Sequence, residues 1–584
     1  MFKMLRFLRP YWRQAVLLVF AIGIQAWGTL RLPTLMSQIV NDGIVANNGG
    51  FIVFTGFKML IWAVISAGGA LLSSYLSARI GSAIGRDMRE ELFKKILSFS
   101  ISEIDNFSTA SLITRTTNDI STVQNTLMMM LSLMLRAPMM AVGAIFEAVI
   151  LAPDMTWIIA LSVGVLIFFI VLILSLVLPK FMIYQKLIDK VNLLTRENLT
   201  GLRVIRAFNN EKYEQKKFEE TNEKIMKTDF FISKLMGLES PLMTFIFNGT
   251  SLLCIWIGIS HLTFDASYLG KMMAFMQYAT QVILSFFFLA ILFVMIPRAS
   301  VSAKRINEVL KTNQKIKWKT SGGGDRVLEP SVEFKDVSFR YAGADEDVIS
   351  NVSFIAKTGE TTAFIGSTGS GKSTLINLVP RFFDVTKGSI LVDGMDVRDY
   401  SSKGLMKKIG YVPQKGFLFS GTVKSNILFG VDDKDDEERM KKAAEIAQAK
   451  EFISKLPDGY DSKIVESGSN VSGGQRQRLS IARAVAKNPE IYIFDDAFSA
   501  LDMKTDKKLR EALKPVTKNS IVLVVAQRVS TIREAEQIIV LDKGRVVGKG
   551  DHKKLIRDCK VYQEICKSQL SEKEYKKELE DVRA

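Results

Sequence analysis

Six long apolar segments constrain this chain of 584 residues more than any other feature. Each is close to the ~20 residues that an α-helix needs to cross the ~30 Å hydrocarbon core of a bilayer. The sequence therefore predicts a multi-pass protein of the cell membrane with six transmembrane helices. The predicted spans cover roughly residues 15–30, 59–76, 127–152, 157–178, 242–260 and 272–296.

Basic residues are sorted between the connections that join these spans. The connections near residues 41–57, 152–156 and 261–271 contain one basic residue, Lys271, whereas those near 79–118 and 179–231 contain many. Because cytoplasmic loops carry the excess of Lys and Arg, this asymmetry places both termini and the two long loops in the cytoplasm. It also explains the net charge of +17 without nucleic acid, so the expected partner is the lipid bilayer.

The composition changes at residues 314–330, where charges and a Gly triplet predict a linker. Short Val/Ile runs alternating with amphipathic helices follow it and predict a soluble α/β domain. We therefore expect a membrane domain in residues 1–313, beginning with an amphipathic surface helix, and an α/β domain in 331–570. Residues 571–584 are expected to form a charged tail. The long cytoplasmic loops show helical periodicity, which predicts that the membrane helices continue into the cytoplasm.

The segment from Gly366 to Ser373 matches the phosphate-binding loop pattern G-x-x-x-x-G-K-[ST]. It follows a strand-like stretch and precedes a helix-like one, as the pattern requires. Backbone N–H groups of such a loop close round phosphate oxygens, Lys372 supplies a positive charge, and the Ser373 hydroxyl is a Mg²⁺ ligand. The predicted ligands are thus ATP and Mg²⁺. The predicted loop contacts are Gly366, Ser367, Thr368, Gly369, Ser370, Gly371, Lys372, Ser373 and Thr374.

A second acidic signal lies at Asp495, which ends the apolar run 491–495. A buried strand that carries a carboxylate at its tip, a domain's width after a phosphate loop, suits the second Mg²⁺ ligand of a P-loop ATPase.

Between these two signals, Val471-Ser-Gly-Gly-Gln475 resembles the L-S-G-G-Q signature of the ATP-binding cassette (ABC) transporters, with Val for Leu at the first position. Six spans followed by one α/β P-loop cassette also resemble one half of an ABC exporter. Other residues at family positions are Tyr341 (expected to stack on adenine), Gln414 (Q-loop and Mg²⁺), Glu466 and Asp502 (D-loop).

This resemblance implies ATP-driven export by two such halves, each ATP lying between one chain's phosphate loop and the other chain's signature. Loop tips near residues 104–107 and 199–208 would couple the membrane helices to the cassettes. The signature residues that would contact the partner's ATP are Ser472, Gly473, Gly474 and Gln475.

Two residues depart from the family pattern. Asp496 stands where the family has a catalytic Glu, and Gln527 stands where it has a switch His. A shorter carboxylate lies roughly 1–1.5 Å further from the attacking water, and misplacement of that size can cost on the order of 100-fold in rate. Glutamine cannot become a cation beside the γ-phosphate. Both changes in one site predict slow hydrolysis there and a heterodimer whose partner supplies an intact Glu and His. The alternative is a homodimer with two impaired sites.

The spans say less about the substrate. Clustered Met at 128–130 and Phe at 286–288 suit an adaptable wall for drugs and other hydrophobic or amphipathic compounds, but are equally ordinary in lipid-facing helices. Arg136 and Glu147 lie inside the third span and mark a candidate functional site, although Arg136 could instead snorkel at the membrane boundary. A lipid or peptide exporter with the same ATPase stays open. Importers and soluble cassette proteins are disfavoured by six spans fused to one cassette.

Overall fold

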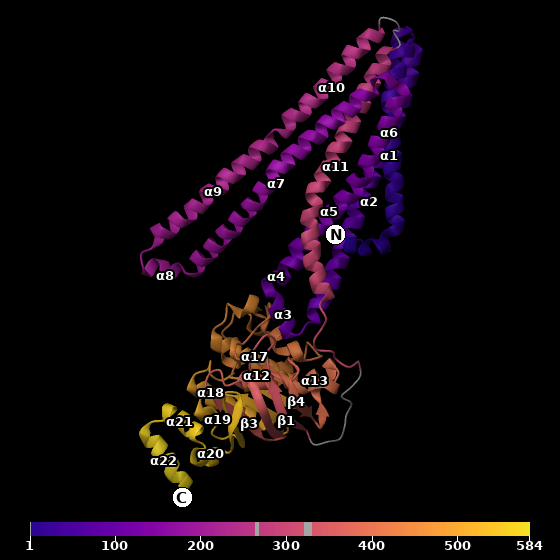
Figure 1. Ribbon diagram of the computed structural model, residues 1–584. Helices are drawn as coiled ribbons and strands as arrows, with labels where there is room; N and C mark the ends of the chain where they lie inside the picture. The colour runs from indigo at the N-terminus through magenta and orange to yellow at the C-terminus, as the bar shows by residue number, and fades with distance from the viewer. Residues whose placement is uncertain (1, 263–267, 321–329, 584) are drawn as a thin grey trace. The chain divides into compact units, whose positions relative to one another are not determined.

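The computed structural model describes residues 2–262, 268–320 and 330–583 (Figure 1). The chain forms two compact units. One unit contains Met1–Leu97 and Thr109–Thr312, and the other contains Ser98–Ser108 and Asn313–Ala584. The second unit therefore includes a short segment that lies, in sequence, between two membrane helices.

The first unit is built from helices. In the described part of the chain, six helical stretches are long and apolar enough to cross a membrane, which confirms the predicted number of spans. The stretches are Met4–Val45, Gly49–Leu97, Thr109–Leu151, Pro153–Thr200, Glu211–Ile259 and Tyr268–Lys311. Their main helices are α1 (Trp12–Gln38), α2 (Gly49–Leu97), α4 (Thr109–Thr114), α5 (Ile120–Met129), α6 (Leu135–Leu151), α7 (Thr156–Thr200), α8 (Leu202–Ala207), α9 (Glu211–Gly237), α10 (Glu239–Leu262) and α11 (Tyr268–Lys311).

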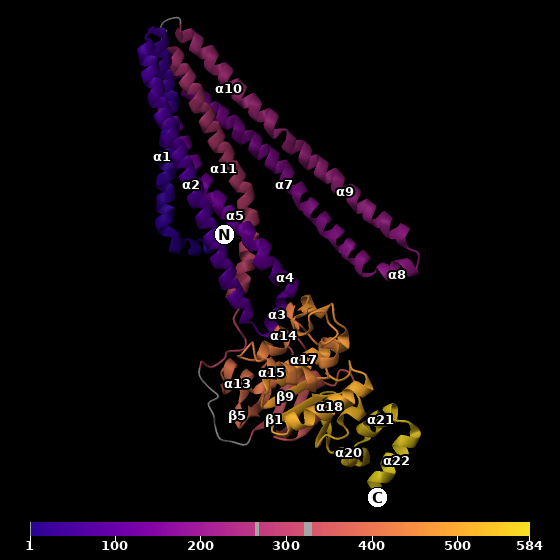
Figure 2. The same cartoon turned by 180° about the vertical axis from the view of Figure 1, so that it is seen from behind.

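These helices are longer than a bilayer requires. At ~1.5 Å per residue, the 49 residues of α2 span roughly 73 Å, more than twice the ~30 Å hydrocarbon core. The long loops predicted to be helical are therefore continuations of the membrane helices. Helix α7 runs back along α9, and the two are joined at α8, as both views show (Figure 1, Figure 2).

In its described residues, the second unit carries three sheets, of which the smallest is the antiparallel pair of β7 (Gly421–Thr422) and β8 (Lys463–Ile464). A six-stranded sheet has the order β12-β11-β3-β10-β9-β6, in which only β12 pairs antiparallel. A four-stranded antiparallel sheet has the order β2-β1-β4-β5. The strands of the larger sheet are β3 (Thr361–Gly366), β6 (Ile409–Val412), β9 (Ile491–Asp495), β10 (Ile521–Val525), β11 (Gln537–Asp542) and β12 (Arg545–Gly550). Those of the smaller sheet are β1 (Ser331–Phe339), β2 (Ile349–Lys357), β4 (Lys387–Val392) and β5 (Met395–Asp396).

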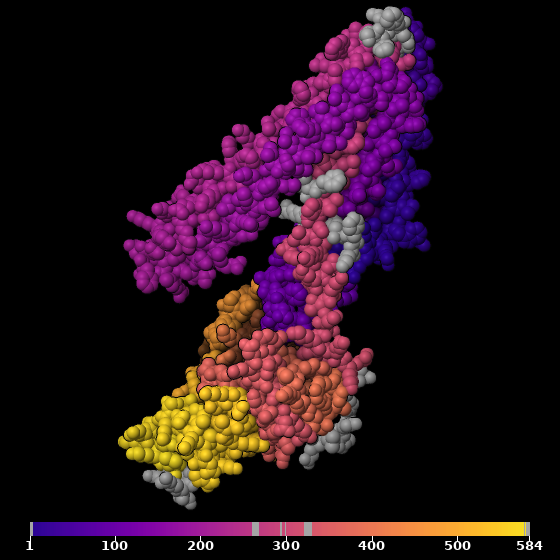
Figure 3. All heavy atoms as spheres, in the orientation of Figure 1, coloured from indigo at the N-terminus to yellow at the C-terminus, as the bar shows by residue number. Residues whose placement is uncertain are grey.

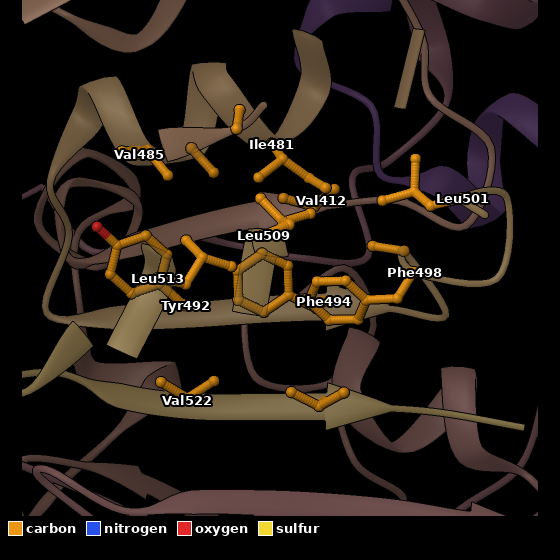
Figure 4. Packing of buried hydrophobic residues seen from close by; sticks show 14 of the residues in the cluster. Val412, Ile481, Val485, Tyr492, Phe494, Phe498, Leu501, Leu509, Leu513 and Val522 are labelled. Carbon is orange, nitrogen blue, oxygen red and sulfur yellow. The ribbon is translucent and has the colours of Figure 1, made fainter. Parts of the chain in front are cut away.

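The middle strands of the larger sheet are buried on both faces. Every residue of β9 and β10 is buried, as expected of a parallel sheet covered on two sides. On one face, Tyr492 and Phe494 of β9 pack with Leu509 and Leu513 of helix α18 (Met503–Thr517) (Figure 4). This packing fixes where the strands end. Val525 of β10 pairs with Asp495 of β9, so the loops after these strands emerge side by side.

The segment Ser98–Ser108 is held in the second unit by a buried carboxylate. Glu103 of helix α3 (Ile101–Phe107) accepts a hydrogen bond from the Ser100 backbone N–H at 2.7 Å and another from the Lys315 N–H at 3.2 Å. The first contact completes a capping box, and the second ties the helix to the chain that enters the cassette. Helix α3 lies at one of the two predicted coupling tips.

We expect Glu103→Ala to weaken local stability by about 1–3 kcal/mol, because it removes the cap and leaves a buried N–H without an acceptor. Hydrogen exchange of the amides of residues 98–108, measured in the full chain, should accelerate. Asp105→Ala on the exposed side of the same helix is the control. Equal exchange in the two variants would contradict the role given to Glu103.

Candidate ATP site

The phosphate loop begins where β3 ends, and helix α12 (Lys372–Asn377) follows it directly. Gly369 and Gly371 have φ of +82° and +94°, in the left-handed region that favours glycine. A Cβ at Gly371 would lie 2.5 Å from the Ile349 side chain, so the packing also requires a glycine there. The predicted strand–loop–helix context is present.

Lys372 is folded over this loop. Its Nζ donates hydrogen bonds to the carbonyl oxygens of Ser367 at 2.7 Å and Gly366 at 2.9 Å. Burial lowers the pKa of its ammonium group, and the charges of Asp495 and Asp496 oppose that shift. The loop thus holds a desolvated positive charge at its centre, which suits phosphate oxygens.

Two of the predicted Mg²⁺ ligands, Ser373 and Asp495, lie together beside the loop. The Ser373 hydroxyl donates to Oδ1 of Asp495 at 2.7 Å. Burial raises the pKa of the Asp495 carboxyl, and the Asp496 charge adds to the rise, whereas the hydrogen bond from Ser373 opposes it. Gln414, the third predicted ligand, is exposed and donates through Nε2, which leaves its Oε1 available. Hydroxyl, carboxylate and amide oxygens are the donors that Mg²⁺ prefers. The residues fit a Mg²⁺ held jointly with phosphate oxygens.

Asp496 and Gln527, the two predicted departures from the family pattern, are in direct contact. Oδ2 of Asp496 accepts hydrogen bonds from Nε2 of Gln527 at 2.7 Å and from Nε2 of Gln414 at 3.3 Å. Asp496 is 5% exposed, and burial raises the pKa of its carboxyl, against the effect of the Gln414 hydrogen bond. One carboxylate oxygen is therefore held by two side-chain amides.

The backbone of Asp496 has φ of +48°, an unusual conformation for a residue other than glycine. Its N–H donates to the Val525 carbonyl at 3.0 Å, and its carbonyl accepts from the Ser499 hydroxyl at 2.8 Å. Asp and Asn are enriched in this left-handed region, because their short polar side chains tolerate it. Aspartate suits the local backbone, a property that the sequence did not reveal.

Tyr341, the predicted adenine contact, is partly exposed beside two other aromatic rings. Its ring packs edge-on against Phe339 and Phe383, with centroids 4.8 Å and 5.3 Å away. Its hydroxyl lies 3.0 Å from Oγ1 of Thr374, and the residue is 37% exposed. This contact joins the predicted adenine residue to the end of the phosphate loop.

The signature begins helix α17 (Gly473–Lys487). Ser472 caps this helix and forms a reciprocal capping box with Gln475, while Ser472 and Gly473 are exposed. The helix N-terminus therefore presents backbone N–H groups outward. In the described residues, no hydrogen bond connects the signature with the chain's own phosphate loop. Asp502 accepts from the Thr505 N–H at 2.9 Å and caps α18.

One residue beside the site escaped sequence analysis. Gln569 ends helix α21 (Lys560–Gln569) and hydrogen-bonds the backbone on both sides of Arg528, next to Gln527. A cavity of about 480 Å³ is lined by Gly366, Lys372 and Gln527 as well as by this helix. An isolated glutamine on an amphipathic helix gives no signal that could have located it.

In the membrane unit, Glu147 of α6 lies 3.9 Å from the guanidinium of Arg31 on α1. Sequence analysis identified Glu147 but not this partner. Arg136 is exposed and forms no hydrogen bond or ion pair within the described part of the chain. Both charges lie on α6, in the predicted span, and of the two only Glu147 has a charged partner among the described residues.

Comparisons with known proteins agree with this architecture. Residues 15–286 match the ABC transporter transmembrane region and residues 349–499 match the ABC transporter domain. An uncharacterised ABC transporter ATP-binding protein of Mycobacterium tuberculosis is 38% identical, over 96% of this chain and 97% of that protein. An ATP-dependent lipid A-core flippase of Desulfotalea psychrophila is 32% identical, over 85% of this chain and 87% of that protein.

The fold is also that of a solved bacterial Atm1-family ABC exporter with ATP bound. The TM-score is 0.79 at 24% identity, and the similarity covers 96% of this chain and 99% of that one. Six apolar helices joined to one P-loop cassette, together with these matches, show an exporter half whose transport is coupled to ATP and which lies in the cell membrane. The chain belongs to the ABC transporter family.

Proposed function

We propose that this chain is the slow-site half of a heterodimeric ABC exporter for hydrophobic or amphipathic compounds. In this proposal, its phosphate loop, Asp495 and Asp496 bind an ATP that is hydrolysed slowly. Its signature, Ser472–Gln475, completes a fast site on a partner that supplies the usual Glu and His.

The observation that carries the proposal is the contact of Asp496 with Gln527 at 2.7 Å. A general base must approach its water within ~3 Å, and a carboxylate already held by two amide donors is a poorer base. Gln527 can donate a hydrogen bond but offers no positive charge to the transition state. The side chains at the base and switch positions, Asp496 and Gln527, thus hydrogen-bond to each other.

The signature, with Val471 for Leu as its one change, supports the same proposal. The exposed start of α17 offers N–H groups and the positive end of a helix dipole to an anion, as a phosphate on a facing chain would need. Val471 is 6% exposed, so the change from Leu lies in the core and not on the contact surface. One chain with a weak base and an intact signature suits an asymmetric pair.

Transport would proceed by alternating access. ATP draws two cassettes together, and helices α3 and α8 pass that movement to the membrane helices. Helix α8 has no buried residue in the single chain, which suits docking on a partner. Bound Mg²⁺, held by Ser373, Gln414 and Asp495, would supply positive charge to the phosphate oxygens. ATP persisting at this chain's site would keep the cassettes together while the partner site cycles.

The ion pair between Arg31 and Glu147 supports an amphipathic substrate. Both side chains are partly exposed, at 42% and 25%, and charges inside a span usually serve a substrate path or each other. The lipid A-core flippase among the relatives favours one alternative, a homodimeric lipid exporter built from two copies of this chain.

The test is ATP turnover by the purified chain alone and by the chain with its candidate partner half. We expect the lone chain to be nearly inactive, Asp496→Asn to leave the pair's turnover largely intact, and replacement of the partner's catalytic Glu by Gln to abolish it. Rapid hydrolysis by the lone chain, abolished by Asp496→Asn, would show instead a homodimer with a working base.

A further inference from the structure

Helix α21 ends with Gln569, whose side chain holds residues 526–528, the loop after β10 that is called the switch loop below. Nε2 of Gln569 donates to the carbonyl oxygen of Gln527 at 2.7 Å. Oε1 of the same amide accepts from the backbone N–H of Val529 at 2.8 Å. Both polar atoms of the Gln569 side chain therefore hydrogen-bond to the backbone, one on each side of Arg528.

The hydrogen bond from the Val529 N–H to Gln569 replaces a missing N-terminal cap of helix α19. Helix α19 (Val529–Ile532) begins after Arg528, whose side chain makes no capping hydrogen bond. The first N–H groups of a helix have no partner within the helix and need one outside it. Gln569 supplies that partner for Val529, so the position of the switch loop depends on a residue 40 positions further along the chain.

The segment that carries Gln569 is itself anchored. Glu578 of helix α22 (Glu572–Arg583) is buried. Its carboxylate lies 3.0 Å from the guanidinium of Arg533, the residue that follows α19, and 3.2 Å from Nε2 of His552. Nδ1 of His552 lies 2.7 Å from the hydroxyl of Tyr562 on α21. The space-filling view shows these last residues, in yellow, as one continuous surface with the rest of the cassette (Figure 3). The expected charged tail is therefore a docked helix.

We propose that Gln569 is a positioning residue of the ATP site, which holds the switch loop so that the Gln527 side chain faces Asp496 and the γ-phosphate. This inference rests on the proposed role of Gln527. Two contacts connect the residues, from Gln569 to the Gln527 carbonyl and from the Gln527 amide to Asp496. The cavity beside the phosphate loop, lined by Gln527 and Gln569, places this chain of contacts at the phosphate end of the site.

The test is release of fluorescent MANT-labelled nucleotides from the full-length transporter with Mg²⁺. MANT-AMPPNP keeps a γ-phosphoryl group and is not hydrolysed, whereas MANT-ADP lacks that group. Gln569→Met, which keeps the length and loses both hydrogen bonds, should speed release of MANT-AMPPNP about three- to tenfold and leave MANT-ADP unchanged.

Two further sets of variants test whether Gln569 acts on nucleotide release through Gln527. Gln563 lies on the same helix and donates to the Arg557 carbonyl at 3.0 Å, away from the switch loop, so Gln563→Met should release both nucleotides at the wild-type rate. If Gln569 acts through Gln527, then Gln527→Ala should speed MANT-AMPPNP release by itself. Adding Gln569→Met to that variant should then change little, because contacting residues are not additive.

Three outcomes would overturn the inference. Faster release of both nucleotides from Gln569→Met would show a general loosening of the cassette. Wild-type release from Gln569→Met, with faster release from Gln527→Ala, would remove the positioning role and leave the role of Gln527 intact. Wild-type release from both variants would remove both roles. Because AMPPNP is not hydrolysed, none of these outcomes depends on whether the site turns ATP over slowly.

Discussion

Replacing Asp496 by Glu together with Gln527 by His is expected to raise ATP turnover at this chain's own site by about two orders of magnitude. Glutamate carries its carboxylate about 1–1.5 Å further toward the water, and misplacement of that size accounts for about 100-fold in rate. Histidine restores a group that can carry positive charge near the γ-phosphate. It also removes the amide that occupies Oδ2 of Asp496. Each single change should give a smaller gain.

The measurement requires that only this site turn over. It is made on the pair whose partner carries Gln at its catalytic Glu, with Asp496→Asn plus Gln527→His as the matched variant that has the switch but no base. The backbone of Asp496, at φ +48°, is less tolerant of Glu than of Asp, so a cassette melting curve is recorded for each variant. No gain from the double variant, with folding unchanged, would show that the slow rate has another cause.

Gly473→Asp is expected to lower turnover of the assembled transporter at least 100-fold, while Lys372→Met in the same chain lowers it much less. Gly473 is the first residue of α17, exposed at its N-terminus, and a Cβ there has open space, with the nearest atom 3.9 Å away. The substitution therefore places a negative charge where the proposal brings the partner's ATP, without disturbing this chain's fold. In the proposed arrangement, Lys372 serves only the slow site.

Gly473→Asn is the matched control, because it has nearly the same shape without the charge. We expect it to reduce turnover less than Gly473→Asp, and the difference between the two should shrink at high ionic strength. ATP turnover of the pair is measured at two salt concentrations. If Lys372→Met is as damaging as Gly473→Asp, the two sites are equivalent and the asymmetric arrangement is wrong.

The sequence alone determined the architecture. Span length, the sorting of basic loops and the phosphate-loop pattern each depend on residues close together in the chain. The bilayer thickness, the charge asymmetry across the membrane and the geometry of phosphate binding act on such local patterns directly. The six spans and the P-loop cassette could therefore be predicted. The assignment of Asp496 and Gln527 to positions where the family has Glu and His stays a prediction from the resemblance.

Only the tertiary structure decided how these residues meet. The contact between Asp496 and Gln527 depends on β9 and β10 being neighbours in the sheet. The left-handed backbone of Asp496 depends on the loop that packing imposes after β9. Three contacts join positions 40 to 212 residues apart. They are the hydrogen bond between Gln569 and Val529, the hydrogen bond between Glu103 and Lys315, and the ion pair between Arg31 and Glu147. Local patterns in a single sequence carry no record of such pairs, because their contacts form only when separate elements pack together.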